Sequence, residues 1–344
     1  MSDPRGRASG AVTLAQVAAE AGVSPATASF VLSGRNGRSS SGSEDTKRRV
    51  RAAADRLGYI PNRYARAMRT GRSDAIVLAL GTVGDPWGIS LARAVRSRAL
   101  PHDLATVVLT DERWYEFLSG YASDCAFVTG ADLVEGGQEQ VARLARSGLE
   151  IVAFGETLVP DGFDIVASSA APAVAAAYRR LHETWGTVGY LSPTLPTSID
   201  DSHPTSRARA FRDAARAEGD EASISQMHAS GRGPGPSLEA CCAWLERPDR
   251  PRAVVCSTGY VALALQAAAL RMGVDVPGEL EFIAIGDVPA DAQLLGPISY
   301  YGVADVFDRI AGLIVDRALT PGGSGPGTKH VFEWEFFPGA TTRG

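Results

Sequence analysis

The side chains best suited to holding a polyanion are concentrated at the beginning of the chain. Residues 1–72 contain 13 Lys and Arg against 5 Asp and Glu, a net charge of +8. Because the whole chain of 344 residues carries −5, the remainder carries −13. Lys and Arg bind phosphate by charge, and a basic arm on an acidic body is typical of nucleic-acid-binding proteins. Charge alone leaves a solvated basic face as the alternative.

Residues suited to catalysis or metal binding form no convincing set. The four cysteines have neither C-x-x-C spacing nor a paired histidine cluster, and no Ser-His-Asp arrangement is evident. The loop 231–235 loosely resembles a phosphate-binding loop, but it follows no strand at the required spacing. We therefore expect no enzyme, no metal site and no cofactor. We expect Cys125, Cys241, Cys242 and Cys256 to be buried free thiols.

Composition and segment lengths bound the architecture. Hydrophobic residues make up 45% and charged residues 21%, as in ordinary globular proteins. A chain of this length predicts two or three compact units. No run of eighteen apolar residues occurs, and no apolar segment follows the first ten residues. The sequence thus predicts no membrane span, no secretory signal and a cytoplasmic location.

The spacing of apolar residues near the N-terminus predicts a helix-turn-helix. The first helix is capped by Thr13, with Gln16 completing a capping box, and it ends before the turn residue Gly22. The second helix begins at Ser24-Pro25 and runs to about residue 33. A third helix is expected over 44–57. The second helix of such a pair is the one that enters the major groove of DNA.

These motifs resemble, in order and spacing, those of the LacI/GalR family of bacterial transcription regulators. The matching stretches are Val12-Thr13-Leu14, Val17-Ala18, Ala21-Gly22-Val23-Ser24, Thr27, Ser29, Val31-Leu32 and Leu57-Gly58-Tyr59-Ile60-Pro61-Asn62. The resemblance is close over the headpiece and looser beyond it. It implies a helix-turn-helix DNA-binding headpiece over 11–60, a hinge helix or linker over 61–73, and an effector-sensing and dimerisation domain over 74–344.

The resemblance also implies which residues contact DNA. Pro25, Ala26 and Phe30 would contact base edges. Their polar neighbours would contact phosphates or base edges. The candidate DNA-binding residues are Thr13, Ser24, Pro25, Ala26, Thr27, Ser29, Phe30, Ser33, Arg35, Tyr59, Asn62, Arg63, Ala65, Arg66 and Met68. Many relatives carry a guanine-binding arginine where this chain has Phe30. A phenylalanine packs on a thymine methyl group or in the headpiece core, so the guanine preference is not expected here.

The segment after the headpiece predicts a short hinge helix. Asn62 can cap it and Gly71 can end it, and two turns are marginally stable alone in water. We expect it to fold on DNA. The resemblance places Met68 where relatives insert an apolar wedge into the minor groove, which kinks the DNA. A plain interdomain linker is the alternative.

Beyond residue 73 the pattern alternates between apolar runs and helices. The runs predict strands over Ala75–Leu80, Leu104–Leu109, Cys125–Thr129, Ile151–Phe154, Thr187–Leu191, Ala253–Cys256 and Phe282–Ile285. Such alternation predicts doubly wound α/β parallel sheets covered on both faces. The length favours two lobes, which the resemblance makes periplasmic-binding-protein-like. The N-lobe is expected over about 74–166 and 303–320, and the C-lobe over about 167–302 and 321–344.

Ligands of such sheets bind at the carboxyl ends of strands. With the resemblance, this rule gives the candidate effector-binding residues Asp85, Trp87, Thr129, Arg207, Thr258, Tyr260 and Asp287. Thr258-Gly259 replaces the family's Asn-Asp pair, and 166–169 lacks the family's carboxylate. A less hydroxylated, aromatic or anionic ligand is therefore expected rather than a free sugar, and the absence of any effector stays open. The alternatives are packing for Trp87 and a surface salt bridge for Arg207.

Together these features predict a DNA-binding transcription regulator, a repressor, that binds a pseudo-palindromic operator in double-stranded DNA. The expected partners are operator DNA, a small-molecule effector in the interlobe cleft and a second copy in a homodimer, with no membrane. No leucine heptad follows residue 337, so no tetramerisation tail is expected. A ligand-independent repressor or an activator of the same fold is the alternative. A small-molecule-binding protein or an enzyme is less favoured.

Overall fold

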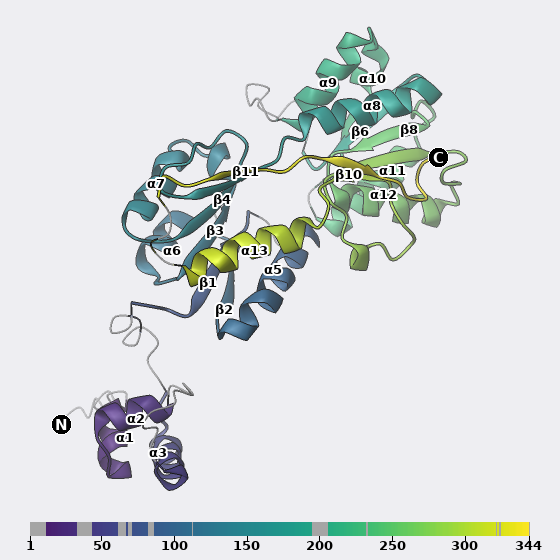
Figure 1. Cartoon of the computed structure of the whole chain (residues 1–344). Coiled ribbons are helices and arrows are strands. Elements are labelled where there is room, and N and C mark those ends of the chain that lie inside the picture. The colour runs from purple at the N-terminus through teal and green to yellow at the C-terminus, as the bar shows by residue number, and fades with distance from the viewer. Residues whose placement is uncertain are drawn as a thin grey trace, which may run out of the picture. The chain divides into compact units, whose positions relative to one another are not determined.

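The computed structural model describes residues 12–32, 43–60, 67, 71–81, 86–111, 113–194, 206–231, 233–320, 322 and 325–343. The chain forms two compact units, Met1–Ser73 and Asp74–Gly344 (Figure 1). Each unit is described by itself.

The described residues of the first unit form the helices α1 (Leu14–Ala21), α2 (Pro25–Leu32) and α3 (Glu44–Leu57). The Thr13 hydroxyl accepts from the Gln16 amide, and the Gln16 side chain accepts from the Thr13 amide, so the predicted capping box is confirmed. Gly22 is left-handed, with a φ of 63° that glycine adopts without strain. The helices bury a small apolar core of Val17, Ala18, Ala21, Ala28, Val31, Val50, Ala53 and Ala54.

The second unit contains two six-stranded sheets, one in each lobe. The first sheet has the order β11-β5-β4-β3-β1-β2, and all its strands are parallel. Its strands are β1 (Ala75–Ala79), β2 (Ala105–Leu109), β3 (Cys125–Thr129), β4 (Ile151–Phe154), β5 (Asp164–Ala167) and β11 (Lys329–Val331). Its helices are α5 (Pro86–Ala99), α6 (Trp114–Gly120), α7 (Gly137–Arg146) and α13 (Val306–Leu319).

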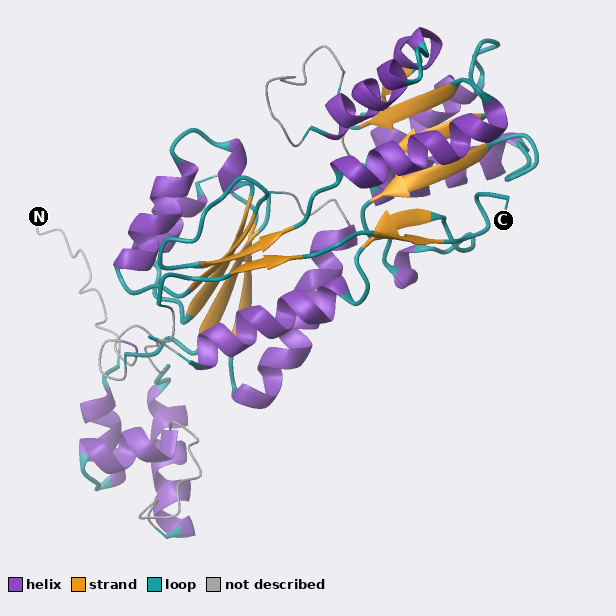
Figure 2. Ribbon diagram, turned by 45° about the horizontal axis from the view of Figure 1, so that its top comes forward, coloured by secondary structure: helices purple, strands orange, loops and turns teal. Residues whose placement is uncertain are grey.

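The second sheet has the order β12-β10-β9-β8-β6-β7, and only its edge strand β12 is antiparallel. Its strands are β6 (Val188–Ser192), β7 (Met227–Ala229), β8 (Ala253–Cys256), β9 (Glu281–Ile285), β10 (Tyr300–Gly302) and β12 (Glu335–Phe337). Its helices are α8 (Ala171–Trp185), α9 (Arg207–Ala217), α10 (Glu221–Ser225), α11 (Pro234–Leu245) and α12 (Gly259–Met272). Figure 2 shows helices flanking the strands in both lobes, which confirms the predicted doubly wound class.

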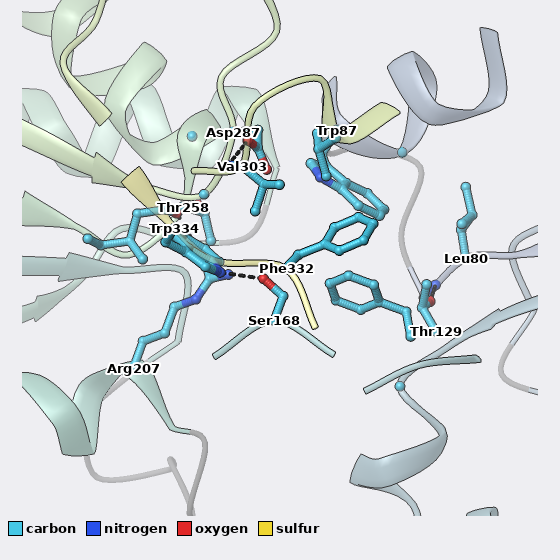
Figure 3. Close-up of a pocket in the computed structure, with 18 of the residues that line it drawn as sticks. Leu80, Trp87, Thr129, Ser168, Arg207, Thr258, Asp287, Val303, Phe332 and Trp334 are labelled. Atoms are coloured by element: carbon cyan, nitrogen blue, oxygen red, sulfur yellow. Dashed lines mark hydrogen bonds between the residues drawn. The ribbon is translucent and has the colours of Figure 1, made fainter. Parts of the chain in front are cut away.

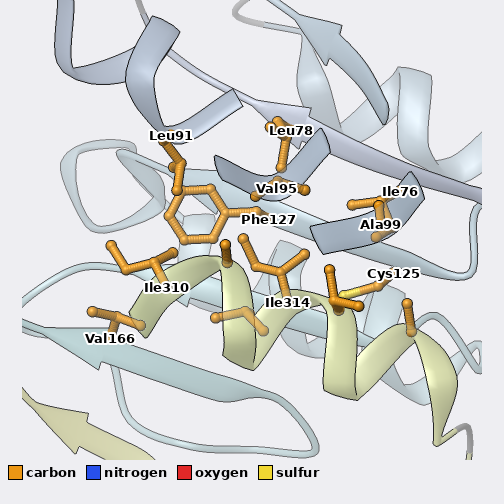
Figure 4. Close-up of a cluster of buried hydrophobic side chains, with 14 of the residues drawn as sticks. Ile76, Leu78, Leu91, Val95, Ala99, Cys125, Phe127, Val166, Ile310 and Ile314 are labelled. Carbon is orange, nitrogen blue, oxygen red and sulfur yellow. The ribbon is translucent and has the colours of Figure 1, made fainter. Parts of the chain in front are cut away.

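The hydrophobic core explains why the apolar runs become buried strands. In the first lobe, α5 and α13 pack side by side on one face of the sheet, where Phe127 meets Leu91 and Ile310 (Figure 4). A separate cluster that includes Trp114 and Val141 covers the opposite face. Burial raises the pKa of the Cys125 thiol, so this cysteine stays protonated, as expected of a buried free thiol. Cys241 and Cys256 are also buried, whereas Cys242 is only partly so.

A buried ion cluster ties α13 to the first sheet. Arg317 Nε lies 3.0 Å from Glu150 Oε2, and Arg317 Nη1 lies 3.2 Å from Asp164 Oδ2. Both carboxylates also accept main-chain N–H groups: Glu150 from Gly322 at 2.7 Å, and Asp164 from Thr328 at 2.7 Å. All three side chains are about nine-tenths buried. The return of the chain after α13 is therefore held by charge as well as by packing.

The expected lobe boundary at the C-terminus is wrong. The segment 321–344 was expected wholly in the C-lobe, but β11 pairs with β5 in the first sheet, with Lys329 opposite Ile165. The chain crosses to the second sheet only afterwards, at 332–334. The cause is the otherwise unpaired edge of β5, whose N–H and C=O groups β11 satisfies. Together with 168–170 and 303–305, this segment makes three crossovers between the lobes.

No helix in the described part of the chain is both long enough and apolar enough to cross a bilayer.

Candidate functional site

A cavity of about 310 Å³ lies between the two lobes of the second unit, at the carboxyl ends of several parallel strands (Figure 3). Five predicted effector-binding residues line it: Trp87, Thr129, Arg207, Thr258 and Asp287. Tyr260 is not among the lining residues and packs instead against the core of the second lobe. Asp85 lies outside the described residues. Residues far apart in the sequence thus meet at the place that the strand-end rule indicates.

The cavity also contains residues that sequence reasoning missed. Phe154, Ser168, Phe332 and Trp334 all line it. Phe154 is the last residue of a correctly predicted strand, so the strand-end rule could have found it. Phe332 and Trp334 lie on the third crossover, which no apolar run or motif signals in the sequence.

Arg207 stands at the start of α9, where the Ser206 hydroxyl caps the helix by accepting from the Arg209 amide. Its Nη1 donates to the Ser257 carbonyl at 2.5 Å and to the Ile285 carbonyl at 3.1 Å. Ser257 directly follows β8, and Ile285 is the last residue of β9. The guanidinium therefore joins the carboxyl ends of these two strands. Arg207 therefore lies on the cavity wall.

Aromatic rings approach the cavity from both sides. The Trp87 ring centroid lies 5.6 Å from that of Phe154 and 6.0 Å from that of Phe307, so Trp87 packs within its lobe as well as lining the cavity. On the other side, Arg207 Cζ lies 5.6 Å from the Trp334 ring centroid. The Trp334 indole N–H in turn donates to Ser168 Oγ. The arrangement forms an apolar slot with one cationic side (Figure 3).

Asp287 contributes a carboxyl group to the lining of the same cavity. Burial raises its pKa to about 6, although the hydrogen bond from the Val303 amide and the charge of Arg207 act in the opposite direction. Its Oδ1 accepts the Val303 amide at 2.7 Å, which connects β9 to the crossover at 303–305. A side chain at Gly302 would place its Cβ 2.4 Å from that same oxygen. Glycine at 302 therefore makes room for the carboxyl group.

The hydroxyl groups of the cavity differ in their partners. Thr129 Oγ1 donates to the Ala79 carbonyl at 3.2 Å and accepts from the Gly81 amide at 3.1 Å, so it mainly joins two strand ends. Thr258 Oγ1 is buried and has no hydrogen-bond partner among the described residues. Thr258 precedes α12 without capping it through its side chain. A buried hydroxyl group without a partner is costly unless a ligand or water satisfies it.

In the first unit, the predicted DNA-contacting residues gather at the start of α2. Ser24, Pro25 and Ala26 are exposed, and Thr27 and Ser29 are partly exposed. Ser24 Oγ accepts the Thr27 amide at 3.1 Å, so the helix begins where predicted. The partly buried Phe30 is not among the residues of the headpiece core, whereas Tyr59 packs against that core.

Thr13 serves the α1 capping box. The remaining candidates, Ser33, Arg35, Asn62, Arg63, Ala65, Arg66 and Met68, lie outside the described residues.

Two family models match the chain. The model of bacterial regulatory proteins, lacI family, matches residues 13–62, and the model of periplasmic binding protein-like domains matches residues 159–319. The HTH-type transcriptional regulator PtxS of Pseudomonas plecoglossicida is 33% identical over 97 residues, 28% of this chain and 28% of that protein. The chain thus spans less than a third of the length of this relative. Catabolite control protein A of Priestia megaterium is 24% identical over 289 residues, 79% of this chain and 81% of that protein.

Solved structures show the same fold. A LacI-family transcriptional regulator from Silicibacter pomeroyi has a TM-score of 0.72 at 21% identity, covering 96% of this chain and 99% of that one. The lac repressor dimer bound to operator and the anti-inducer ONPF has a TM-score of 0.65 at 17% identity, covering 97% and 100%. The chain thus contains a lacI-family helix-turn-helix region over residues 13–62 and a periplasmic binding protein-like region over residues 159–319, and it has the fold of these solved regulators.

Proposed function

We propose that this chain is a sequence-specific DNA-binding transcription regulator, a repressor, whose affinity for its operator is modulated by a small molecule in the interlobe cavity. The carrying observation is the capped helix-turn-helix, which leaves the start of α2 exposed at Ser24, Pro25 and Ala26. A helix presented in this way fits the major groove, and the basic residues of the first unit supply the attraction to phosphate. The role is not enzymatic.

A dimer is part of the proposal, because one headpiece contacts only a half-site and a two-fold dimer implies a pseudo-palindromic operator. A groove of the second unit, between α5 and the edge strand β2, is lined by the exposed apolar residues Ile89 and Val108, and Arg93 and Arg96 also line it. Apolar surface of this kind is what a second copy would cover. The lac repressor, a structural neighbour, is described as a dimer bound to operator.

Regulation follows from the position of the cavity. A ligand held between the lobes favours one lobe arrangement, and it shifts DNA affinity only by its differential affinity for the two arrangements. Such coupling typically amounts to about 1–3 kcal/mol. Structural neighbours from Lactobacillus casei are described with bound glucose and with bound sucrose, which supports a small-molecule site in this fold.

The DNA-binding part is tested with a matched pair of charge substitutions on exposed alanines. The operator is first selected from random duplexes, and affinity is then measured by gel shift. Ala26→Glu on α2 should weaken specific binding at least tenfold, because a carboxylate would face base edges and phosphates. Ala52→Glu on α3 introduces the same charge and should have a much smaller effect. No preference for any duplex over random competitor at low ionic strength would overturn the proposal.

The hinge and the effector response are tested separately. Met68→Gly should weaken specific binding strongly while the thermal unfolding of the second unit is unchanged, since the proposed wedge acts only on bound DNA. Unchanged operator affinity would refute the wedge. If no small molecule in a metabolite screen alters operator affinity, the regulator is ligand-independent and the cavity has another use.

A further inference from the structure

The cavity has more aromatic and cationic character than a hydroxyl-rich ligand requires. Most of its polar side chains are already engaged by the protein: Thr129 by two main-chain groups, Ser168 by Trp334, and Asp287 by Val303. A sugar must find partners for many hydroxyl groups, and each hydroxyl left unmatched in a closed site costs affinity. The aromatic residues Trp87, Phe154 and Trp334, in contrast, offer faces and edges to a planar ring.

The cationic side of the cavity is held rigidly. The two carbonyl groups that accept from Arg207 Nη1 fix the guanidinium, and the Trp334 ring lies against it. A guanidinium has five N–H donors in a planar fork, a geometry that matches a carboxylate. A charge that is positioned before the ligand arrives loses little entropy on binding.

The beginning of α12 adds to this positive side. Thr258 and Gly259 line the cavity, and the first turn of this 14-residue helix contains no acidic residue. The N–H groups of a first helical turn and the helix dipole favour an anion. The buried Thr258 hydroxyl, without a partner among the described residues, is a further donor at the same place.

The loop after β9 crowds position 259. A side chain there would bring its Cβ to 3.1 Å from Val288 Cγ2 and 3.2 Å from the Asp287 carbonyl oxygen. Such contacts are tighter than those of ordinary packing, so a side chain at this position would require its neighbours to shift slightly. Asp287 already interacts with the charge of Arg207 on this wall, whereas the first turn of α12 contains no acidic residue, so a ligand carboxylate is expected on the α12 side of Arg207.

We propose that the effector is a planar aromatic carboxylate, with its carboxylate between Arg207 and the beginning of α12 and its ring between Trp334 and the Trp87–Phe154 pair. This assignment rests on the proposed function, because it names the ligand class of the same cavity. The volume of about 310 Å³ falls at the lower end of small-molecule sites, which suits a single-ring acid.

The test titrates the full-length protein with benzoate, 4-hydroxybenzoate and phenylacetate, each against its neutral amide, and with glucose. Isothermal calorimetry measures affinity, and tryptophan fluorescence reports occupancy because Trp87 and Trp334 both line the cavity. At least one acid should bind with a Kd below about 1 mM and at least tenfold more tightly than its amide. Equal affinity for acid and amide, tighter binding of glucose, or no saturation by any acid up to about 10 mM would each overturn the assignment.

Substitutions locate the site. Arg207→Gln should weaken acid binding at least tenfold, whereas Arg209→Gln, on the same helix but exposed, should leave it unchanged. Thr258→Val keeps the shape and removes the hydroxyl, so it should weaken acid binding several-fold without changing the melting temperature. Since Arg207 also holds strand ends, Arg207→Gln is judged only under conditions where circular dichroism shows a folded protein. Unaltered acid affinity in both Arg207→Gln and Thr258→Val would place the acid elsewhere and refute the proposal.

Operator binding is measured on the same preparation without ligand. Selective duplex binding without acid binding would refute only the proposal that the effector is an aromatic carboxylate. Acid binding without duplex selectivity would refute the proposed DNA-binding function, while the assignment of the ligand class would still hold.

Discussion

The Trp334 indole donates a hydrogen bond to Ser168 Oγ, and this contact joins the first and third crossovers between the two lobes. Both residues also line the cavity, and Trp334 lies against Arg207. A ligand that displaces the Trp334 ring would therefore act directly on two of the segments about which the lobes can move.

This relationship can be measured with a double-mutant cycle. Ser168→Ala and Trp334→Phe should each destabilise the second unit, and the pair should show a coupling of about 0.5–1.5 kcal/mol, the usual contribution of one hydrogen bond. Urea unfolding followed by circular dichroism gives the four free energies of unfolding. Strict additivity of the two single effects would show that the hydrogen bond contributes nothing to stability.

The Arg317 cluster predicts a large loss of stability. Arg317→Met would keep most of the packing but leave Glu150 and Asp164 as buried carboxylates without their cation. Breaking a buried ion pair from one side costs about 3–5 kcal/mol. Arg113→Met removes an exposed arginine that pairs with Asp111, and it should hardly change the unfolding free energy, because exposed ion pairs contribute little to stability. Similar losses of unfolding free energy in the two variants would contradict the structural role of Arg317.

Asp287 predicts a pH dependence of stability. Its pKa is raised from 3.8 to about 6, so between these values the folded protein binds a proton that the unfolded chain has released. The unfolding free energy should therefore fall as pH rises through this window, by at most about 1.4 kcal/mol per pH unit from this group. Asp287→Asn, which retains an oxygen acceptor for the Val303 amide, should remove that slope. Parallel curves for the two proteins between pH 4 and about 6.5 would contradict the raised pKa.

Gly137 predicts a steric effect at the beginning of α7. A Cβ at this buried position would lie 2.0 Å from the Ala131 carbonyl oxygen, so the backbone must shift. Gly137→Ala should cost about 1–3 kcal/mol or more, as overpacking does. Gly120→Ala, at the end of α6 with nothing within 4 Å of its Cβ, should be neutral or slightly stabilising. Equal melting temperatures for the two variants would contradict the predicted steric effect at Gly137.

Local patterns in the sequence determined much of the architecture. The capping box at Thr13, the turn at Gly22 and the strands Cys125–Thr129, Ile151–Phe154 and Ala253–Cys256 all appear where predicted. Their signals are local, since a cap, a left-handed turn and an unbroken apolar run each depend on a few consecutive residues. The strand-end rule likewise placed Trp87, Thr129 and Asp287 near one another, because parallel strands share one carboxyl edge.

Only the tertiary structure decided the rest. The short strand β11 carries no apolar run, and it belongs to the first sheet because β5 offers an unpaired edge. The same crossing brings Phe332 and Trp334 into the cavity, and the approach of Val288 and Asp287 leaves little room for a side chain at Gly259. Such contacts join residues that are distant in the chain. They arise from side-chain packing and from the pairing of main-chain N–H and C=O groups at sheet edges. Neither can be predicted from a few consecutive residues.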